Sequence, residues 1–162
     1  MPAPPSIYIA SPLGFLAYTR AFNSELVTLV TRKGARALDP WNTNEGRMLG
    51  ELCANNAGEQ EIARANLVVG RANMAMIREC DGLLACLDGV SVDDGTAAEI
   101  GYAVGIGRIA GGFRLDPRSS GDNRATTVNL QIASLIESTG GTIHQTPEPA
   151  LDHLLERLAA KR

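Results

Sequence analysis

Short apolar runs alternate along this chain with longer segments in which apolar residues recur every three or four positions. The short runs are typical of strands buried on both faces of a parallel sheet, and the longer periodicity is typical of helices with one buried face. The pattern predicts strands at residues 6–10, 35–38, 82–87, 109–113 and 142–144. It predicts helices at residues 17–32, 59–79, 96–107 and 125–138, and a last helix opened by Pro147. This alternation predicts an α/β fold with a doubly wound, five-stranded parallel sheet, in one domain over residues 1–162.

Two polar features stand apart from this pattern. Residues 42–56 are polar and mixed, and only a short helix near residues 49–52, over the active face, is expected there. Within the predicted helix 59–79, Asn66 and Asn73 fall on or beside the apolar stripe. They are interpreted as hydrogen-bonded buried groups or as residues at the solvent edge.

Carboxylates gather where the predicted third strand gives way to the next helix. Asp93, Asp94 and Glu99 surround this junction, and ligands of open α/β sheets bind just beyond the carboxyl ends of the strands. A structural explanation competes with a chemical one. Thr96 and Glu99 have the spacing of a capping box, in which the Thr caps the helix and the Glu returns to the Thr amide. Asp94 could be the cap instead, with Gly95 allowing the turn.

Two arguments favour a chemical role for this cluster in addition to capping. A capping box uses one Thr and one Glu, which leaves Asp93 and Asp94 in excess at the same place. The helix dipole is also expected to hold Glu99 ionised, as a carboxylate nucleophile requires.

Composition narrows the classes of function. The chain has 162 residues, of which 44% are hydrophobic and 20% charged, as in ordinary globular proteins. The net charge of −3 comes without a basic patch, so we expect no nucleic-acid partner. No apolar run is long enough to span a bilayer, and the segment from Met1 to Pro5 does not resemble a signal peptide. We therefore expect no membrane partner and a cytoplasmic location.

Metal ligands and cofactor motifs are scarce in the sequence. Cys53, Cys80 and Cys86 lack paired spacing and are interpreted as reduced core residues. His144 and His153 lie in segments that look structural, so no metal site is expected. The first strand-to-helix turn lacks the glycine fingerprint of dinucleotide-binding proteins, and no GxxxxGK[ST] loop is present. We expect neither a nicotinamide cofactor nor ATP.

A set of motifs follows one another in order along nearly the whole chain, from residue 7 to about residue 143. These motifs are Tyr8, Pro12-Leu13-Gly14-Phe15, Asp39-Pro40-Trp41, Cys80-Asp81, Asp93-x-Gly95-Thr96-x-x-Glu99-Ile100-Gly101-Tyr102-Ala103, Gly112-Phe113-Arg114-x-Asp116-x-Arg118, Gly121-Asp122-Asn123 and Val128-Asn129-Leu130. The ordered set resembles the nucleoside 2-deoxyribosyltransferases. The resemblance implies a flavodoxin-like fold and transfer of a 2-deoxyribosyl group between nucleobases through a covalent glycosyl-enzyme. It implies deoxynucleosides and free nucleobases as small-molecule partners, and no metal or organic cofactor.

The resemblance also implies catalytic residues. Glu99 would be the nucleophile that attacks C1′, and Tyr8 would hydrogen-bond and orient it. Asp81 and Asp93 would hold the sugar hydroxyls and manage the proton on the departing or incoming base. The chemistry is consistent with these roles, because a carboxylate nucleophile divides one difficult displacement into two easier ones.

Further residues are implied to bind the substrate. Phe15 would stack on the base, and Asp94 and Gly95 would line the site beside the catalytic carboxylates. Asn129 would reach the site of a neighbouring subunit, since the family builds its sites across subunit contacts. A homo-oligomer with shared sites is therefore implied. Residues 42–56 are a candidate for the segment that sets base specificity.

Two other functions stay open at this point. The first is hydrolysis of a nucleoside or nucleoside 5′-monophosphate on the same scaffold, with Arg114 and Arg118 gripping a 5′-phosphate. Those arginines could instead pair with Asp116 or Asp122 and order their own loop. The second is a nucleoside-binding module without catalysis, because a fold alone does not dictate function.

Overall fold

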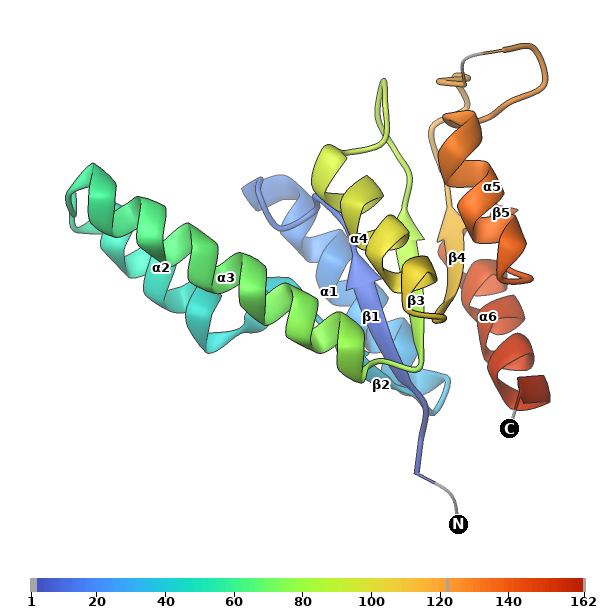
Figure 1. The fold of residues 1–162 in the computed structure, drawn as a ribbon, viewed down its shortest axis with the longest axis horizontal. Helices are drawn as coiled ribbons and strands as arrows, with labels where there is room; N and C mark the ends of the chain where they lie inside the picture. The colour runs from blue at the N-terminus through green and yellow to red at the C-terminus, as the bar shows by residue number, and fades with distance from the viewer. Residues whose placement is uncertain (1–2, 122, 162) are drawn as a thin grey trace.

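The computed structural model describes residues 3–121 and 123–161. Five parallel strands form one sheet in the order β2-β1-β3-β4-β5 (Figure 1). The strands are β1 (Ser6–Ala10), β2 (Arg36–Leu38), β3 (Gly82–Cys86), β4 (Ile109–Phe113) and β5 (Ile143–His144). This order is that of flavodoxin-like folds, so the predicted five-stranded, doubly wound sheet is confirmed.

Six α-helices and one short 3₁₀ helix connect and cover these strands in the described residues. They are α1 (Ala17–Arg32), the 3₁₀ helix η1 (Pro40–Asn42), α2 (Asn44–Ala54), α3 (Glu59–Glu79), α4 (Asp94–Gly105), α5 (Leu130–Ser138) and α6 (Pro147–Lys161). The predicted limits of the first strand, of α1 and of α3 agree with the structure residue for residue.

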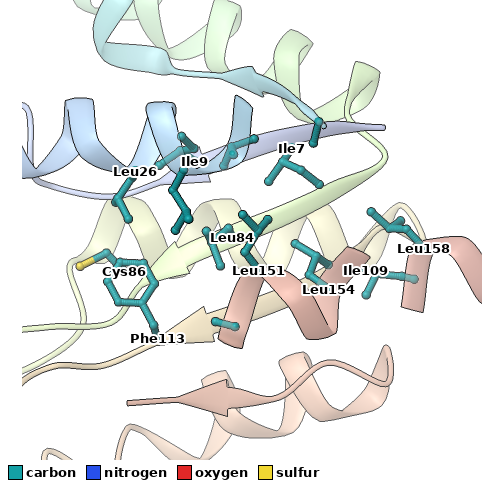
Figure 2. Packing of buried hydrophobic residues seen from close by; sticks show 14 residues of the cluster. Ile7, Ile9, Leu26, Leu84, Cys86, Ile109, Phe113, Leu151, Leu154 and Leu158 are labelled. Atoms are coloured by element: carbon teal, nitrogen blue, oxygen red, sulfur yellow. The ribbon is translucent and has the colours of Figure 1, made fainter. Parts of the chain in front are cut away.

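Each face of the sheet has its own apolar core. On one face α1 and α6 pack against side chains such as Ile9 and Leu84, and Figure 2 shows Leu151 and Leu154 of α6 in this cluster. On the other face α3, α4 and α5 cover Tyr8 and further strand residues. The central strands β1, β3 and β4 are buried along their whole length, which explains their continuous apolar sequences.

The order of the strands reverses between β1 and β3. The chain leaves β1 toward β2 on one side, whereas it leaves β3 toward β4 on the other. A crevice for ligands opens at such a switch point, outside the carboxyl ends of the two strands. Helix α4 begins at this edge, so its acidic N-terminal residues lie where the sequence predicts chemistry.

Three helices begin elsewhere than predicted, each for a local reason. Helix α4 begins at Asp94 because Asp93, and not Thr96, is its N-cap. Helix α5 begins only at Leu130, behind the N-cap Asn129, instead of near residue 125. Helix α2 is longer than the short turn expected near residues 49–52, because the Thr43 hydroxyl caps it by accepting from the Gly46 amide at 3.0 Å.

Helices α2 and α3 form a hairpin that reaches beyond the sheet at the side of β2 (Figure 1). No residue of α2 is buried, and only Ala65 and Ile77 of α3 are. Cys53 on α2 is exposed, so its interpretation as a core residue is wrong, whereas Cys80 and Cys86 are buried free thiols. None of the helices within residues 3–121 and 123–161 has the length and apolarity needed to cross a membrane.

Candidate active site

A tyrosine and a glutamate meet beneath the switch point of the sheet. Tyr8 lies on β1 and is fully buried, and Glu99 lies in the second turn of α4. The Tyr8 hydroxyl donates a hydrogen bond to Glu99 Oε1 at 2.5 Å. This length is typical of a hydroxyl bound to a charged carboxylate. Because Tyr8 is held on both sides by the sheet, it fixes the carboxylate of Glu99 in one orientation.

The surroundings of Glu99 disfavour the ionised form of its carboxyl group. Burial raises the pKa of Glu99 from 4.5 to about 7, and the nearby charge of Asp93 adds to the rise. Hydrogen bonds from Tyr8 and Asn73 lower the pKa again, but only in part. The helix dipole was expected to hold Glu99 ionised, but the loss of hydration on burial raises the pKa of its carboxyl instead.

The pKa of Tyr8 is raised as well. Burial, followed by the charge of Glu99 and the hydrogen bond to it, raises the pKa of Tyr8 far above its usual value. The hydroxyl therefore stays protonated and acts as a donor toward Glu99 throughout the neutral range.

Asn73 is the neighbour of Glu99 that the sequence analysis missed. It lies on α3, and its side chain hydrogen-bonds to the Glu99 carboxylate. Its carbonyl oxygen Oδ1 is buried without a partner in the described part of the chain. A signal was present in the sequence, since Asn73 precedes the buried Ile77 by one helical turn and shares its side of α3. Asn73 therefore offers an unused acceptor next to the carboxylate.

Asp93 combines capping with a place at the site. Its Oδ2 accepts hydrogen bonds from the Thr96 amide at 2.8 Å and from the Thr96 hydroxyl at 3.1 Å. The predicted capping box of Thr96 and Glu99 is wrong, because Thr96 donates to Asp93 and Glu99 turns to Tyr8. The cap engages only Oδ2 of Asp93. Within the described chain Oδ1 of Asp93 accepts no hydrogen bond, so this oxygen is available to a ligand.

Asp94 and Gly95 lie in the first turn of α4, beside this cap, and both are exposed. The Gly95 amide donates to Asp94 Oδ1 at 2.8 Å. Their position at the rim is compatible with contact to a substrate. That contact stays a prediction.

Asp81 does not join this cluster. It precedes β3, so it lies at the amino ends of the strands, on the edge of the sheet opposite to the crevice. There its Oδ2 accepts from the Ser6 amide at 2.7 Å and from the Ser6 hydroxyl at 2.9 Å. These bonds tie β1 to β3, and the assignment of Asp81 to the sugar and the base is corrected by its position in the fold.

Phe15 and Asn129 are exposed, and no hydrogen bond in the described residues links either of them to Glu99. Asn129 caps α5, where its Oδ1 accepts from the Gln131 amide at 2.9 Å. Phe15 packs edge-on against Trp41, with ring centroids 4.5 Å apart. The roles predicted for these two residues, in a neighbouring subunit's site and on the base, stay predictions.

A polar network braces the carboxyl ends of β1 and β2. The buried Asn23 donates to both carboxylate oxygens of Asp39 at 3.2 Å and accepts from the Ser11 hydroxyl at 3.2 Å. The Trp41 indole donates to the Ser11 carbonyl at 2.9 Å. A Cβ atom on Gly14 would lie 1.9 Å from the Trp41 ring, so only glycine fits there. The network holds the partly buried Trp41, and with it the exposed Phe15, at the edge of the sheet where β1 and β2 end.

Arg114 and Arg118, which the alternative hydrolase hypothesis assigns to a 5′-phosphate, both bind groups of the protein itself. Arg114 is buried and donates to the carbonyls of Leu87, of Gly89 at 2.9 Å and of Arg118 at 2.7 Å. Arg118 binds Asp116 through several contacts, the shortest at 2.5 Å, which hold the pKa of the Asp116 carboxyl well below its usual range. Both arginines order their own loop. Asp122, the other partner considered for them, lies outside the described residues.

Comparison with known sequences gives a family and a distant relative. A family model described as nucleoside 2-deoxyribosyltransferase matches residues 7–131. An uncharacterised protein of Schizosaccharomyces pombe is 27% identical over 118 residues, which are 70% of this chain and 52% of that protein. The chain thus spans about half the length of the curated relative that it matches.

Solved structures share the fold at low sequence identity. A conserved protein of Enterococcus faecalis V583 aligns with a TM-score of 0.65 and 24% identity, over 96% of this chain and 99% of that one. A 2-deoxyribosyltransferase of Bacillus psychrosaccharolyticus aligns with a TM-score of 0.57 and 19% identity, over 81% and 82%. A CMP N-glycosidase of Clostridium botulinum aligns with a TM-score of 0.51 and 16% identity, over 93% and 96%. At these identities the likeness concerns the fold alone.

Proposed function

The chain belongs to the nucleoside 2-deoxyribosyltransferase family, and we propose that it transfers a 2-deoxyribosyl group from one nucleobase to another. The observation that supports this most is the hydrogen bond from Tyr8 to Glu99, which orients a carboxylate at the switch point of the sheet. A carboxylate fixed in this way is suited to attack a sugar carbon.

In the first step, an oxygen of ionised Glu99 attacks C1′ of the deoxynucleoside. A bond forms between that oxygen and C1′ while the bond from C1′ to the base nitrogen breaks. The electron pair of the broken bond leaves with the base, which takes up a proton. Positive charge builds up at C1′ in the transition state, as in retaining glycosidases. A 2-deoxy sugar resists this charge less, because it has no electron-withdrawing hydroxyl at C2′.

In the second step, a nitrogen of the incoming base attacks C1′ from the side that the first base left. The bond between C1′ and Glu99 breaks, its electron pair returns to the carboxylate, and the incoming base loses a proton. The open oxygen of Asp93 is the group at the rim that we assign to a sugar hydroxyl or to the proton of the base.

Asn73 and Tyr8 act on Glu99 as positioning residues in this proposal. Each donates a hydrogen bond to the carboxylate, and each lowers its pKa toward the neutral range in which the nucleophile must be ionised. Phe15 is assigned to the base and Asn129 to the site of a neighbouring copy. Asp94 and Gly95, in the first turn of α4, are assigned to contacts with the substrate.

The activity is tested by incubating the purified protein with deoxyinosine, with and without free adenine, and separating the products by chromatography. We expect deoxyadenosine only when adenine is present, and little free deoxyribose. Free deoxyribose that accumulates with or without adenine would instead identify a hydrolase. Deoxyinosine that binds but stays unchanged would identify a binding module.

The nucleophile is tested with Glu99→Gln, which keeps the size of the side chain and removes its charge. We expect base exchange to fall by at least about 10³-fold, as for other lost nucleophiles. Glu61→Gln, on the exposed side of α3, is the matched control and should keep the wild-type rate. Near-normal exchange by a folded Glu99→Gln protein would refute the covalent mechanism.

A further inference from the structure

A second pocket lies on the edge of the sheet opposite to Glu99. It has a volume of about 580 Å³ and lies where β4 begins, among the C-terminal ends of α4, α5 and α6. Figure 1 shows the C-terminal ends of these three helices toward the edge of the sheet at which the strands begin, with α6 on one face and α4 and α5 on the other. Three cationic residues line it, Arg108, Arg157 and Lys161, and we call it the basic pocket. The proposed transfer reaction does not use it.

The charge of the basic pocket is not neutralised by its surroundings. No acidic residue is among the described residues that line it. Each of the three helix ends contributes about half a negative charge through its unpaired carbonyl groups. Lys161 donates to the Gly107 carbonyl at 3.1 Å, and Arg108 donates to the Arg78 carbonyl. Three full positive charges exceed these partial charges, so the pocket keeps an excess of roughly one to two positive charges.

Donor groups in the pocket are also left unused. Arg108 Nε is buried and has no partner in the described residues. The guanidinium of Arg157 makes no hydrogen bond or ion pair within the part of the chain that the structure describes. It lies over Gly140, where a Cβ atom would approach Arg157 Nη2 to 2.6 Å. The glycine therefore leaves room for a guanidinium that has no acceptor among residues 3–121 and 123–161.

We propose that the basic pocket binds a small anion that carries a phosphate group. Guanidinium groups match the oxygen atoms of phosphate in pairs, and a lysine adds a mobile charge. The volume is in the range of small-molecule sites and exceeds what free phosphate needs. Val104, Ile109 and Ala160 supply an apolar part of the lining. A nucleoside monophosphate therefore meets the same chemistry as free phosphate, with more of the pocket filled.

The proposal is tested first with inorganic phosphate, because this probe has neither sugar nor base for the Glu99 site. We expect calorimetric titration at constant ionic strength to show saturable binding to the wild-type protein. Arg157→Gln and Lys161→Gln should each weaken it by about tenfold, as for a lost charged hydrogen bond. Arg64→Gln, on the exposed surface of α3, is the matched control and should bind as the wild type does. Absent binding, or equal binding by all four proteins, would overturn the proposal.

A second titration identifies the source of the phosphate group. Deoxyadenosine 5′-monophosphate is compared with inorganic phosphate, and deoxyadenosine measures binding at the Glu99 site. Tighter binding of the nucleotide that Arg157→Gln weakens would assign the pocket to nucleotides, and equal affinities would assign it to free phosphate. Nucleotide and phosphate binding that Arg157→Gln and Lys161→Gln both leave unchanged would overturn the proposal. None of these results depends on the transfer reaction, so this proposal and the proposed function can fail separately.

Discussion

At the scale of single residues, the protonation of Glu99 is decided by competition between hydration and local donors. The influence of a helix dipole falls off within the first turn, and Glu99 lies in the second turn of α4. Burial therefore prevails, and the pKa reaches about 7 in spite of the two hydrogen bonds that favour the charged form. A carboxylate with this pKa is close to half ionised at neutral pH, so modest changes in its surroundings alter the fraction that can attack.

We predict that kcat/KM for base exchange rises with pH through about 7, because only ionised Glu99 attacks C1′. Tyr8→Phe removes a hydrogen bond that lowers the pKa of Glu99, so the rising limb should move to higher pH. Asn73→Ala should move it in the same direction. Initial rates measured from acidic to alkaline pH give the position of the limb.

Tyr102→Phe is the control for this experiment, since the Tyr102 hydroxyl accepts from Arg78 and does not contact Glu99 in the described structure. Its profile should coincide with that of the wild type. A limb that stays in place in both Tyr8→Phe and Asn73→Ala would show that a different group titrates.

Some residues of the site could be predicted from the sequence and others could not, because a sequence pattern does not show which side chains meet in the fold. Tyr8, Asp93 and Glu99 were predicted, and the fold brings them together. Asp81 was misplaced because its role came from the resemblance alone, whereas its place before the strand that begins at Gly82 puts it at the amino ends of the strands, away from Glu99. Asn73 was missed because helical periodicity gives the buried side of α3 but not which residue of α4 it meets.

At the scale of elements, helix α4 owes its start and part of its chemistry to one side chain. Asp93 stabilises the helix by accepting two hydrogen bonds from Thr96. The same carboxylate raises the pKa of Glu99 through its charge. The two effects can be separated, because an asparagine caps helices about as well as an aspartate but carries no charge.

We predict that Asp93→Asn keeps the free energy of unfolding close to that of the wild type, whereas Asp93→Ala loses about 0.5–2 kcal/mol. Asp93→Asn should also move the rising limb of the pH profile to lower pH, since a charge that raises the pKa of Glu99 is gone. Urea unfolding and initial rates on the same samples test both statements. Equal loss of stability in the two variants would mean that the charge, and not the cap, holds α4.

Elements were predicted well where one pattern dominated and poorly where a polar side chain set the boundary. The strands β1, β3 and β4 are continuous apolar runs, and the structure buries them completely. The starts of α4 and α5 were misjudged because Asp93 and Asn129 compete with neighbouring candidates for the cap. The start of helix α2 was missed because its first turn is polar and the hydroxyl of Thr43 sets the boundary.

At the scale of the whole molecule, burying the carboxyl group of Glu99 away from water lowers the free energy of unfolding at neutral pH. The folded protein binds the proton of Glu99 more tightly than the unfolded chain, whose pKa is near 4.5. Below that value both states are protonated and nothing is lost. As pH rises to about 7, the unfolded chain ionises first, and the folded state is disfavoured to a growing extent.

We therefore predict that Glu99→Gln is more stable than the wild type at pH values above about 7, by about 1–2 kcal/mol after allowance for the partial exposure of Glu99. The gain should shrink toward acidic pH and vanish near 4.5. Thermal and urea unfolding across this range measure it, with Glu61→Gln as the exposed control. A gain that is independent of pH would contradict the assignment.

The hydrogen bond between Tyr8 and Glu99 joins positions that are 91 residues apart in the chain. We expect a contact of such long range to form late in folding, because a large loop must close before the hydrogen bond can offset the loss of chain entropy. Helices and single strands can form earlier from local interactions, but none of them orients the carboxylate. A chain that is still folding thus carries the proposed nucleophile without the hydrogen bond that orients it.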